Sequence, residues 1–397
     1  MHGARARPAG TPARAALSCT CQMACRLRRL HGHIVFHSRA FERDSPMCVG
    51  HGATAESSTQ GGITRVTDGL LGGHVHPSIC VAPSSGDVIV VFNRGPGDAN
   101  ELLLCRSTDK GVSWTEPVVL PSSVDRCPGG VYPGALTVLK SGEIVLHWYR
   151  YGPTAAQRWQ YGPEYCVSSD DGHTFGPPQL IDTRDRPDGH TQPEGRFPFL
   201  ELDDETWVLP LYDRTVAYNR RTGVLATWGD GRNHGMVPLV QTPTGTLVSG
   251  APQLDAPAPV GKPDPSGEMV YGLRSSNSGM TWQPLHQLGH FGVCGYDLTV
   301  LTNGWIVHTA VIYGVGVDGE YAYELWLSRD DGLSFDRDHG AVVYNPGRRI
   351  TGRGWPRTVQ LDDKTLGTLF YDLTQSPEQA GGPSLWFQTT LIEDLLP

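Results

Sequence analysis

Four copies of one eight-residue pattern constrain the fold of this 397-residue chain more than any other feature. Each reads Ser-x-Asp/Asn-x-Gly-x-Ser/Thr-aromatic, and the copies are Ser107–Trp114, Ser168–Phe175, Ser275–Trp282 and Ser328–Phe335. The short acidic or amide side chain can accept hydrogen bonds from backbone amides of a tight turn, and Gly two residues later tolerates a positive φ. The closing aromatic residue can pack where the next strand begins. Repetition of such a turn predicts a repeat architecture.

A longer repeat, with a period of about 40–65 residues, surrounds these turns. Each repeat opens with a residue pair that usually ends in Pro, continues into an apolar run, turns, and returns in a second apolar run. The six openings are His76-Pro77, Tyr132-Pro133, Phe197-Pro198, Val237-Pro238, Tyr296-Asp297 and Trp355-Pro356. Short runs rich in Val, Ile and Trp and bounded by turn residues predict strands. Six repeats, each long enough for four antiparallel strands, predict an all-β, six-bladed β-propeller.

The eight-residue turn is missing from two repeats, and the sequence explains one of these absences. If each turn joins the third and fourth strands of a blade, the sixth blade lacks it when its fourth strand comes from the start of the domain. Residues Ile63–Thr67 have the composition of that strand and are predicted to pair with Leu385–Thr390. The third repeat has only a degenerate turn, at Arg221–Gly223.

Residues 1–60 differ in composition from the rest of the chain, because seven arginines precede the first acidic residue, Glu42. No sustained apolar run follows these arginines, so we do not expect a secretory signal. We expect a disordered or targeting-like extension over residues 1–60 and the propeller over residues 61–397. The nine Cys include no Cys-x-x-Cys pair, which favours free and mostly buried thiols in a reducing, cytoplasmic compartment.

Charge and hydropathy bear on the partners of the chain. A formal net charge of −9 argues against nucleic-acid binding. No apolar run approaches the roughly 18 residues of a membrane span. His74 and His76 are spaced as metal ligands on one strand face, but a hydrogen-bonded structural pair is the favoured interpretation. We therefore expect no metal and no cofactor.

The eight-residue turns resemble Asp-boxes, also called bacterial neuraminidase repeats. Together with the six-blade pattern, they make the chain similar to the sialidase superfamily over about residues 63–395. The resemblance implies that the boxes lie on the blade rims, away from the active centre. It also implies an active centre in which three arginines bind the substrate carboxylate. A Tyr assisted by a Glu would act as nucleophile, and an Asp in a loop of the first blade as acid/base.

Several positions depart from the pattern of that family. Val75 stands where the first arginine is expected, Gly250 ends a strand where another arginine belongs, and Trp355–Arg357 replaces a Tyr-Ser opening. Arg94 followed by Asp98 matches better, as the arginine and acid/base Asp after the first blade. The resemblance therefore implies a glycoside hydrolase that acts on a carbohydrate other than ordinary sialic acid.

The inner strands of a propeller begin around one central funnel, so the site is expected at the six openings and at the ends of the second strands. The predicted catalytic residues are Asp98 as acid/base, and Glu194 or Asp297 as second carboxylate or as activator of Tyr296. The predicted substrate-binding residues are Arg94, Arg150, Arg196, His76, Trp355 and Arg357. Arginine suits anionic or hydroxyl-rich ligands, and aromatic rings in a concave site can stack on a sugar.

Other interpretations of these residues stay open. Asp98 also fits an ordinary turn, Glu194 can pair with Arg196, and Trp355 and Tyr296 can be packing residues of their blades. Two further functions also stay open: a non-catalytic propeller that binds carbohydrate or protein, and a polysaccharide lyase in which His or Tyr abstracts a proton beside a uronate. A pair of carboxyl groups about 5–10 Å apart would favour hydrolysis, whereas unsaturated products that absorb in the ultraviolet would indicate a lyase.

Overall fold

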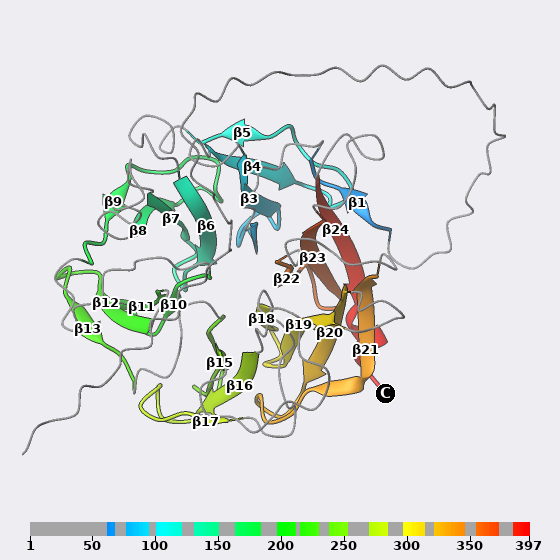
Figure 1. Ribbon diagram of the computed structural model, residues 1–397. Coiled ribbons are helices and arrows are strands. Elements are labelled where there is room, and N and C mark those ends of the chain that lie inside the picture. Colours follow the sequence, from blue (N-terminus) through cyan, green and yellow to red (C-terminus); the bar gives the residue numbers. More distant parts are fainter. Residues whose placement is uncertain are drawn as a thin grey trace, which may run out of the picture. The chain divides into compact units, whose positions relative to one another are not determined.

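Six four-stranded antiparallel sheets form the blades of a propeller, as the repeat pattern predicts (Figure 1). This computed structural model describes residues 62–67, 77–94, 101–120, 131–150, 163–183, 197–211, 215–229, 238–252, 270–284, 297–313, 321–345, 355–372 and 384–397. The predicted N-terminal extension lies outside the described residues. None of the described residues belongs to a helix with the length and hydropathy that crossing a bilayer requires.

Blades 1 to 3 follow one another along the chain, each from its inner strand outward. Blade 1 contains β2 (Ser78–Val81), β3 (Val88–Arg94), β4 (Glu101–Ser107) and β5 (Val118–Val119). Blade 2 contains β6 (Val131–Val138), β7 (Ile144–Arg150), β8 (Pro163–Ser168) and β9 (Gln179–Leu180). Blade 3 contains β10 (Leu200–Glu201), β11 (Thr206–Pro210), β12 (Thr215–Asn219) and β13 (Leu225–Thr227).

Blades 4 to 6 complete the ring. Blade 4 contains β14 (Val240–Gln241), β15 (Leu247–Pro252), β16 (Val270–Ser275) and β17 (Gln283–Pro284). Blade 5 contains β18 (Asp297–Val300), β19 (Ile306–Tyr313), β20 (Tyr321–Ser328) and β21 (Asp336–Tyr344). Blade 6 contains β22 (Arg357–Gln360), β23 (Thr365–Asp372), β24 (Ser384–Leu391) and β1 (Thr64–Arg65). A short 3-10 helix, η5 (Ile392–Leu395), follows β24.

The predicted closure of the ring by an N-terminal strand is confirmed. In β1, Thr64 pairs with Phe387 and Arg65 with Trp386 in antiparallel register. The Arg65 guanidinium also donates a hydrogen bond of 2.9 Å to Ser384 Oγ. Blade 6 therefore combines three strands from the C-terminal end of the propeller with one from its start, which explains why this blade lacks the eight-residue turn.

The four eight-residue turns, called boxes from here on, lie between the third and fourth strands of blades 1, 2, 4 and 5, as predicted. In the first box, Asp109 accepts hydrogen bonds of 2.8 Å from the Ser113 N–H and 2.5 Å from its hydroxyl. Ser107 Oγ accepts the Gly111 N–H at 2.7 Å. Gly111 has the expected positive φ of 92°, and Lys110 before it also has a positive φ, of 58°. Two successive left-handed residues thus fold the box back on its own side chains.

Each box also contacts the preceding blade, a feature that the sequence pattern does not reveal. Asp171 of the second box accepts hydrogen bonds of 3.3 and 2.7 Å from the Ser84 and Ser85 N–H groups of blade 1. Asp331 of the fourth box pairs with Arg274 of blade 4 at 2.8 Å. Because both partners are largely buried, this pair is worth more than a pair on an open surface. In the second and fourth boxes, the fourth residue therefore connects two blades.

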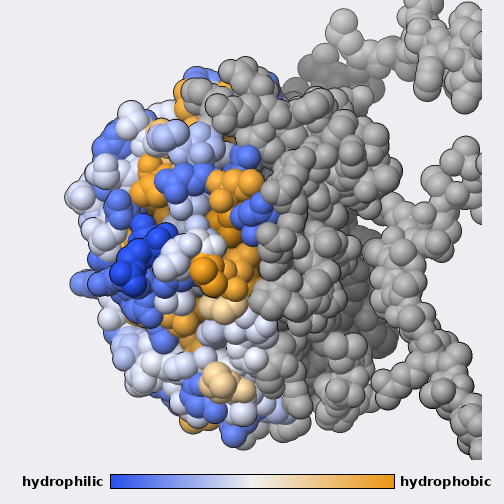
Figure 2. Space-filling view, turned by 90° about the vertical axis from the view of Figure 1, so that its left-hand side faces the viewer, coloured by the Kyte–Doolittle hydropathy of each residue, from blue (hydrophilic) through white to orange (hydrophobic). Residues whose placement is uncertain are grey.

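The hydrophobic core consists of layers between neighbouring blades. Ile89 and Trp148, for example, belong to the layer between blades 1 and 2. The three Cys of the described residues, Cys80, Cys105 and Cys166, are free and buried in these layers. On the outer side of blades 2 and 3 that faces the viewer in Figure 2, hydrophilic and apolar groups are interspersed.

Candidate functional site

Three of the predicted site residues have described side chains, and they lie at the openings of two neighbouring inner strands. Asp297 begins β18 in blade 5, and Arg357 begins β22 in blade 6 with Trp355 two residues before it. Arg94 and Arg150 end β3 and β7 as predicted, but their side chains lie outside the described part of the chain. The other predicted residues also lie outside it: Asp98, Glu194, Tyr296, Arg196 and His76.

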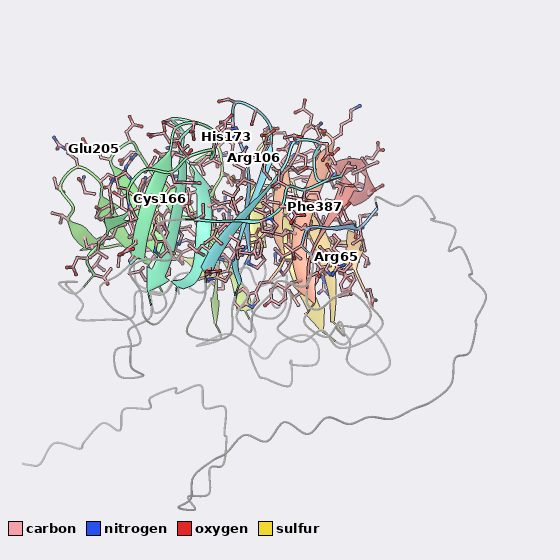
Figure 3. All side chains as sticks on the ribbon, turned by 90° about the horizontal axis from the view of Figure 1, so that it is seen from above. Arg65, Arg106, Cys166, His173, Glu205 and Phe387 are labelled. Carbon is pink, nitrogen blue, oxygen red and sulfur yellow. The ribbon has the colours of Figure 1, made fainter. Side chains whose placement is uncertain are left out.

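This end of the blades is opposite to the end that carries the boxes. Figure 3 shows His173, from the second box, and Arg106 at one end of the blades, whereas Arg65 lies toward the other end. Arg65 contacts Ser384 at the start of β24. β24 starts at the end of the blades where the inner strands open and runs toward the end that carries the boxes. The boxes and the candidate site are therefore separated by the length of the blades.

Asp297 links blade 5 to blade 6. Its Oδ1 lies 3.4 Å from Arg357 Nη1, and its Oδ2 accepts a 3.0 Å hydrogen bond from the Thr358 N–H. The side chains of Arg357 and Asp297 are only 4% and 10% exposed, so solvent does little to screen their attraction. Burial raises the pKa of the Asp297 carboxyl, an effect that the Arg357 guanidinium and the Thr358 N–H oppose. Both carboxylate oxygens are thus engaged within the protein.

At other blade junctions a neutral hydroxyl accepts the N–H of the next inner strand. Ser78 Oγ accepts the Leu136 N–H at 2.9 Å between blades 1 and 2, and Thr137 Oγ1 accepts the Phe199 N–H at 2.9 Å between blades 2 and 3. A buried carboxylate costs more to desolvate than a hydroxyl. The contact with Arg357, rather than the strand junction alone, therefore explains why a carboxylate stands at position 297.

A buried network of hydroxyl groups supports the backbone around this ion pair. Thr309 Oγ1 lies 2.6 Å from Thr358 Oγ1, which in turn lies 3.0 Å from Thr368 Oγ1. Thr299 Oγ1 donates a 2.7 Å hydrogen bond to the Thr358 carbonyl oxygen. His308 Nδ1 lies 3.1 Å from the Asp297 carbonyl oxygen. Because these contacts join β18, β19, β22 and β23, the openings of blades 5 and 6 are held as one unit.

Arg357 also contacts an aromatic ring from a distant blade. Its guanidinium carbon lies 4.1 Å from the centroid of the Phe197 ring, which is fully buried. Phe197 precedes β10 of blade 3, three blades away from blade 6, so the two side chains meet across the ring axis. Phe197-Pro198 was predicted to open the third repeat, but no role was predicted for Phe197. An aromatic residue at an opening was the available signal, and its partner depends on how the ring closes.

Trp355 is buried at 6% exposure, in the same cluster as Phe197. Its φ of 39° is positive, which is unusual for a bulky residue that is not Gly. Such backbone conformations cost about 1–3 kcal/mol and persist where surrounding contacts enforce them. The segment that leads into Arg357 is therefore held in a conformation that it would not adopt alone.

The described site is a buried arginine held by a carboxylate on one side and an aromatic face on another. Within the described ranges, no group of three or more His, Cys, Asp or Glu side chains is arranged to hold a metal ion. Asp297 is suited to orienting Arg357, because its oxygens already accept hydrogen bonds from that residue and Thr358. The arrangement provides an immobilised hydrogen-bond donor at the centre of the ring.

Neither a family model nor a curated protein matches the sequence. Similar solved structures include a protein of unknown function from Dyadobacter fermentans, with a TM-score of 0.58, 16% identity and coverage of 83% of this chain and 99% of that one. A mutant of the NanB sialidase from Streptococcus pneumoniae has a TM-score of 0.54, 10% identity and coverage of 85% and 71%. The endosialidase of phage phi92 has a TM-score of 0.54, 10% identity and coverage of 84% and 69%.

At such low identities these similarities establish the fold alone. The chain has the six-bladed, sialidase-like propeller fold, which is a glycoside hydrolase-like fold. This result confirms the fold that the eight-residue turns and the six-blade pattern implied.

Proposed function

We propose that the chain is a glycoside hydrolase that acts on a sugar other than ordinary sialic acid. The observation that carries the proposal is the Arg357 guanidinium, which Asp297 and Phe197 hold at the centre of a sialidase-like ring. A charged donor fixed in a water-poor site can stabilise charge that develops on a substrate without reorganising first. The sugar differs from sialic acid because Val75 and Gly250 stand where a carboxylate-binding arginine set is expected.

The proposed roles assign proton transfer to residues near the funnel and orientation to Asp297. Asp98 is the acid/base, and Glu194 is the second carboxylate. Asp297 orients Arg357 rather than reacting itself, because both of its oxygens accept hydrogen bonds inside the protein. Tyr296, directly before Asp297, is the candidate nucleophile in a reaction of the Tyr type.

Arginine and aromatic groups supply the proposed contacts to the substrate. Arg94, Arg150 and Arg196 lie at or next to the funnel ends of the inner blade strands in the sequence pattern. Together with Arg357 they favour a hydroxyl-rich or anionic ligand, because each guanidinium offers five N–H donors. His76 and Trp355 complete the proposed binding set.

The test is a screen of the full chain against a panel of aryl glycosides, followed by Asp98→Asn in the same assay. We expect hydrolysis of at least one glycoside, and loss of that turnover in Asp98→Asn with an unchanged unfolding midpoint. Asp363→Asn, a change in an exposed turn between β22 and β23, is the matched control and should retain turnover. Undiminished turnover in Asp98→Asn would remove that residue as acid/base, and a panel without any hydrolysis would refute the hydrolase.

A second candidate function is non-catalytic binding of carbohydrate. It is favoured by the mutual pairing of Asp297 and Arg357, since the two charges satisfy each other inside the protein. Glycan-array binding without turnover of any bound glycan would support it. Release of unsaturated products that absorb in the ultraviolet would instead support a lyase.

A further inference from the structure

We propose that Phe197 is a positioning residue for Arg357, so that blade 3 controls the substrate-binding arginine of blade 6 through a contact across the ring axis. The functional part of this inference rests on the proposed function, in which Arg357 binds the sugar. The structural part, that the Phe197 ring fixes the guanidinium, stands on the contact itself.

The geometry of the contact meets the requirements of a strong cation–π interaction. The Arg357 guanidinium carbon lies 4.1 Å from the Phe197 ring centroid, well inside the limit of about 6 Å. Phe197 is 0% exposed and Arg357 is 3% exposed, so little solvent competes for the cation. Desolvated pairs of this kind lie at the upper end of their range of strength.

Two contacts of different kinds restrain the guanidinium in complementary directions. Asp297 accepts a hydrogen bond from the guanidinium, with 3.4 Å between Asp297 Oδ1 and Arg357 Nη1, while the guanidinium carbon lies over the Phe197 ring. A carboxylate alone leaves a guanidinium free to rotate about the line that joins the two groups. The aromatic face removes that freedom, because the flat cation gains most when it stays over the ring.

The surroundings of Phe197 distinguish it from an ordinary core phenylalanine. Most members of its hydrophobic cluster come from blades 6 and 1, although Phe197 itself belongs to blade 3. Phe199, two residues later, instead stacks on His147 of the adjacent blade 2 at 4.0 Å. Phe199 is also a buried phenylalanine beside the opening of blade 3. It packs between the adjacent blades 2 and 3, whereas Phe197 reaches across the ring.

The strained backbone before Arg357 supports the same conclusion. Trp355, with its φ of 39°, packs in the cluster that contains Phe197. The indole and the phenyl ring therefore belong to one packed unit that fixes the direction in which β22 begins. Strained backbone persists where the neighbouring structure enforces it. Here the contacts that enforce the Trp355 conformation also fix the position of Arg357.

The experiment compares Phe197→Leu with Phe199→Leu, its matched control, in the full chain. Arg357→Met and the double variant Phe197→Leu/Arg357→Met complete a double-mutant cycle in urea unfolding. Arg357→Met leaves the Asp297 carboxylate without its partner in both the single and the double variant. The cost of that unpaired carboxylate therefore cancels from the coupling energy. We expect a coupling that corresponds to about a 3- to 30-fold change in the unfolding equilibrium constant, and no coupling between Phe199→Leu and Arg357→Met.

A spectroscopic measurement reports the position of the guanidinium without any substrate. The Arg357 Nε–H resonance should carry a ring-current shift in the native chain that Phe197→Leu removes and Phe199→Leu leaves in place. Phe197→Tyr retains the aromatic face and should retain the shift. An additive cycle, or a resonance that does not change in Phe197→Leu, would overturn the proposal even if the protein proves to be a hydrolase.

With the glycoside identified by the screen, Phe197→Leu should raise KM about tenfold with little change in kcat, and Phe197→Tyr should restore it. Phe199→Leu should leave KM unchanged. A coupled cycle with an unchanged KM in Phe197→Leu would limit Phe197 to a structural role. If no glycoside is hydrolysed, the hydrolase proposal fails, while the cycle and the resonance still decide whether Phe197 positions Arg357.

Discussion

Replacing Asp297 by Ala removes two contacts at once and tests how far the junction of blades 5 and 6 depends on charge. Arg357 loses the carboxylate 3.4 Å from its Nη1, and the Thr358 N–H loses its acceptor at 3.0 Å. Removing one member of a buried ion pair typically costs about 3–5 kcal/mol, because the remaining charge is buried without its partner. Ser78→Ala removes only a neutral acceptor of the Leu136 N–H, which costs about 1–3 kcal/mol.

Urea unfolding followed by intrinsic fluorescence measures both variants on one scale. With a slope of about 3 kcal/mol per molar for a domain of this size, Asp297→Ala should lower the midpoint by about 1 M or more. Ser78→Ala should lower it by less. In the double variant Asp297→Ala/Arg357→Met the buried charge is absent, so part of the loss should be recovered. Equal midpoints for Asp297→Ala and Ser78→Ala, together with no recovery, would refute the argument that the pair is held as charged partners.

Three further predictions concern the box end of the blades. Gly332→Ala should destabilise the chain by about 1–3 kcal/mol more than Gly245→Ala. Both glycines have positive φ, but only at Gly332 would the added Cβ clash, with the Val248 side chain; equal urea midpoints would contradict this. Hydrogen bonds from Ser113 lower the pKa of Asp109 to about 2. A hydrogen bond from Lys110 lowers the pKa of Asp362 to about 2. A carboxyl whose pKa is lower in the folded than in the unfolded chain contributes its full stabilisation above the unfolded-state pKa, and this stabilisation is lost as the pH falls through the folded-state pKa. The urea midpoint should therefore drop between about pH 4 and pH 2, and the drop should be less steep in Asp362→Asn. At pH 7, Asp109→Asn should lower the urea midpoint by less than Asp109→Ala does, since the third box carries Asn at this position.

The turn chemistry and the strand pattern predicted the fold because both are local. A box needs only residues within eight positions of one another, and the inner strands begin at or close to the predicted openings. The degenerate turn of blade 3 is explained by a shorter local solution. Asn219 Oδ1 accepts hydrogen bonds of 2.9 Å from the Thr222 N–H and hydroxyl, and Gly223 has a φ of 72°. A turn of this length does not need the Ser and aromatic positions of the box.

The contacts between blades could not be predicted in the same way. Asp171 was recognised as part of a turn, but its hydrogen bonds to the Ser84 and Ser85 N–H groups depend on the distance between two blades. The contact of Phe197 with Arg357 depends on closure of the whole ring. The sequence singled out Asp297, Trp355 and Arg357, which have described side chains, but it did not predict the contact between Asp297 and Arg357. The functional roles of these three residues and of the predicted residues outside the described ranges stay predictions.

The separation of boxes and openings by the length of the blades makes stability and ligand binding independently testable. At the box end, Asp331 and Arg274 join blades 4 and 5 far from the ring axis, so their removal should change the free energy of unfolding and leave ligand affinity intact. At the opening end, Asp297 joins blades 5 and 6 through the same arginine that is proposed to bind the sugar. A change there alters both quantities, because one guanidinium serves the junction and the site. The two ends of the blades should therefore give different relations between unfolding midpoint and affinity, and a common relation for both sets of variants would argue that Arg357 has no role beyond the junction.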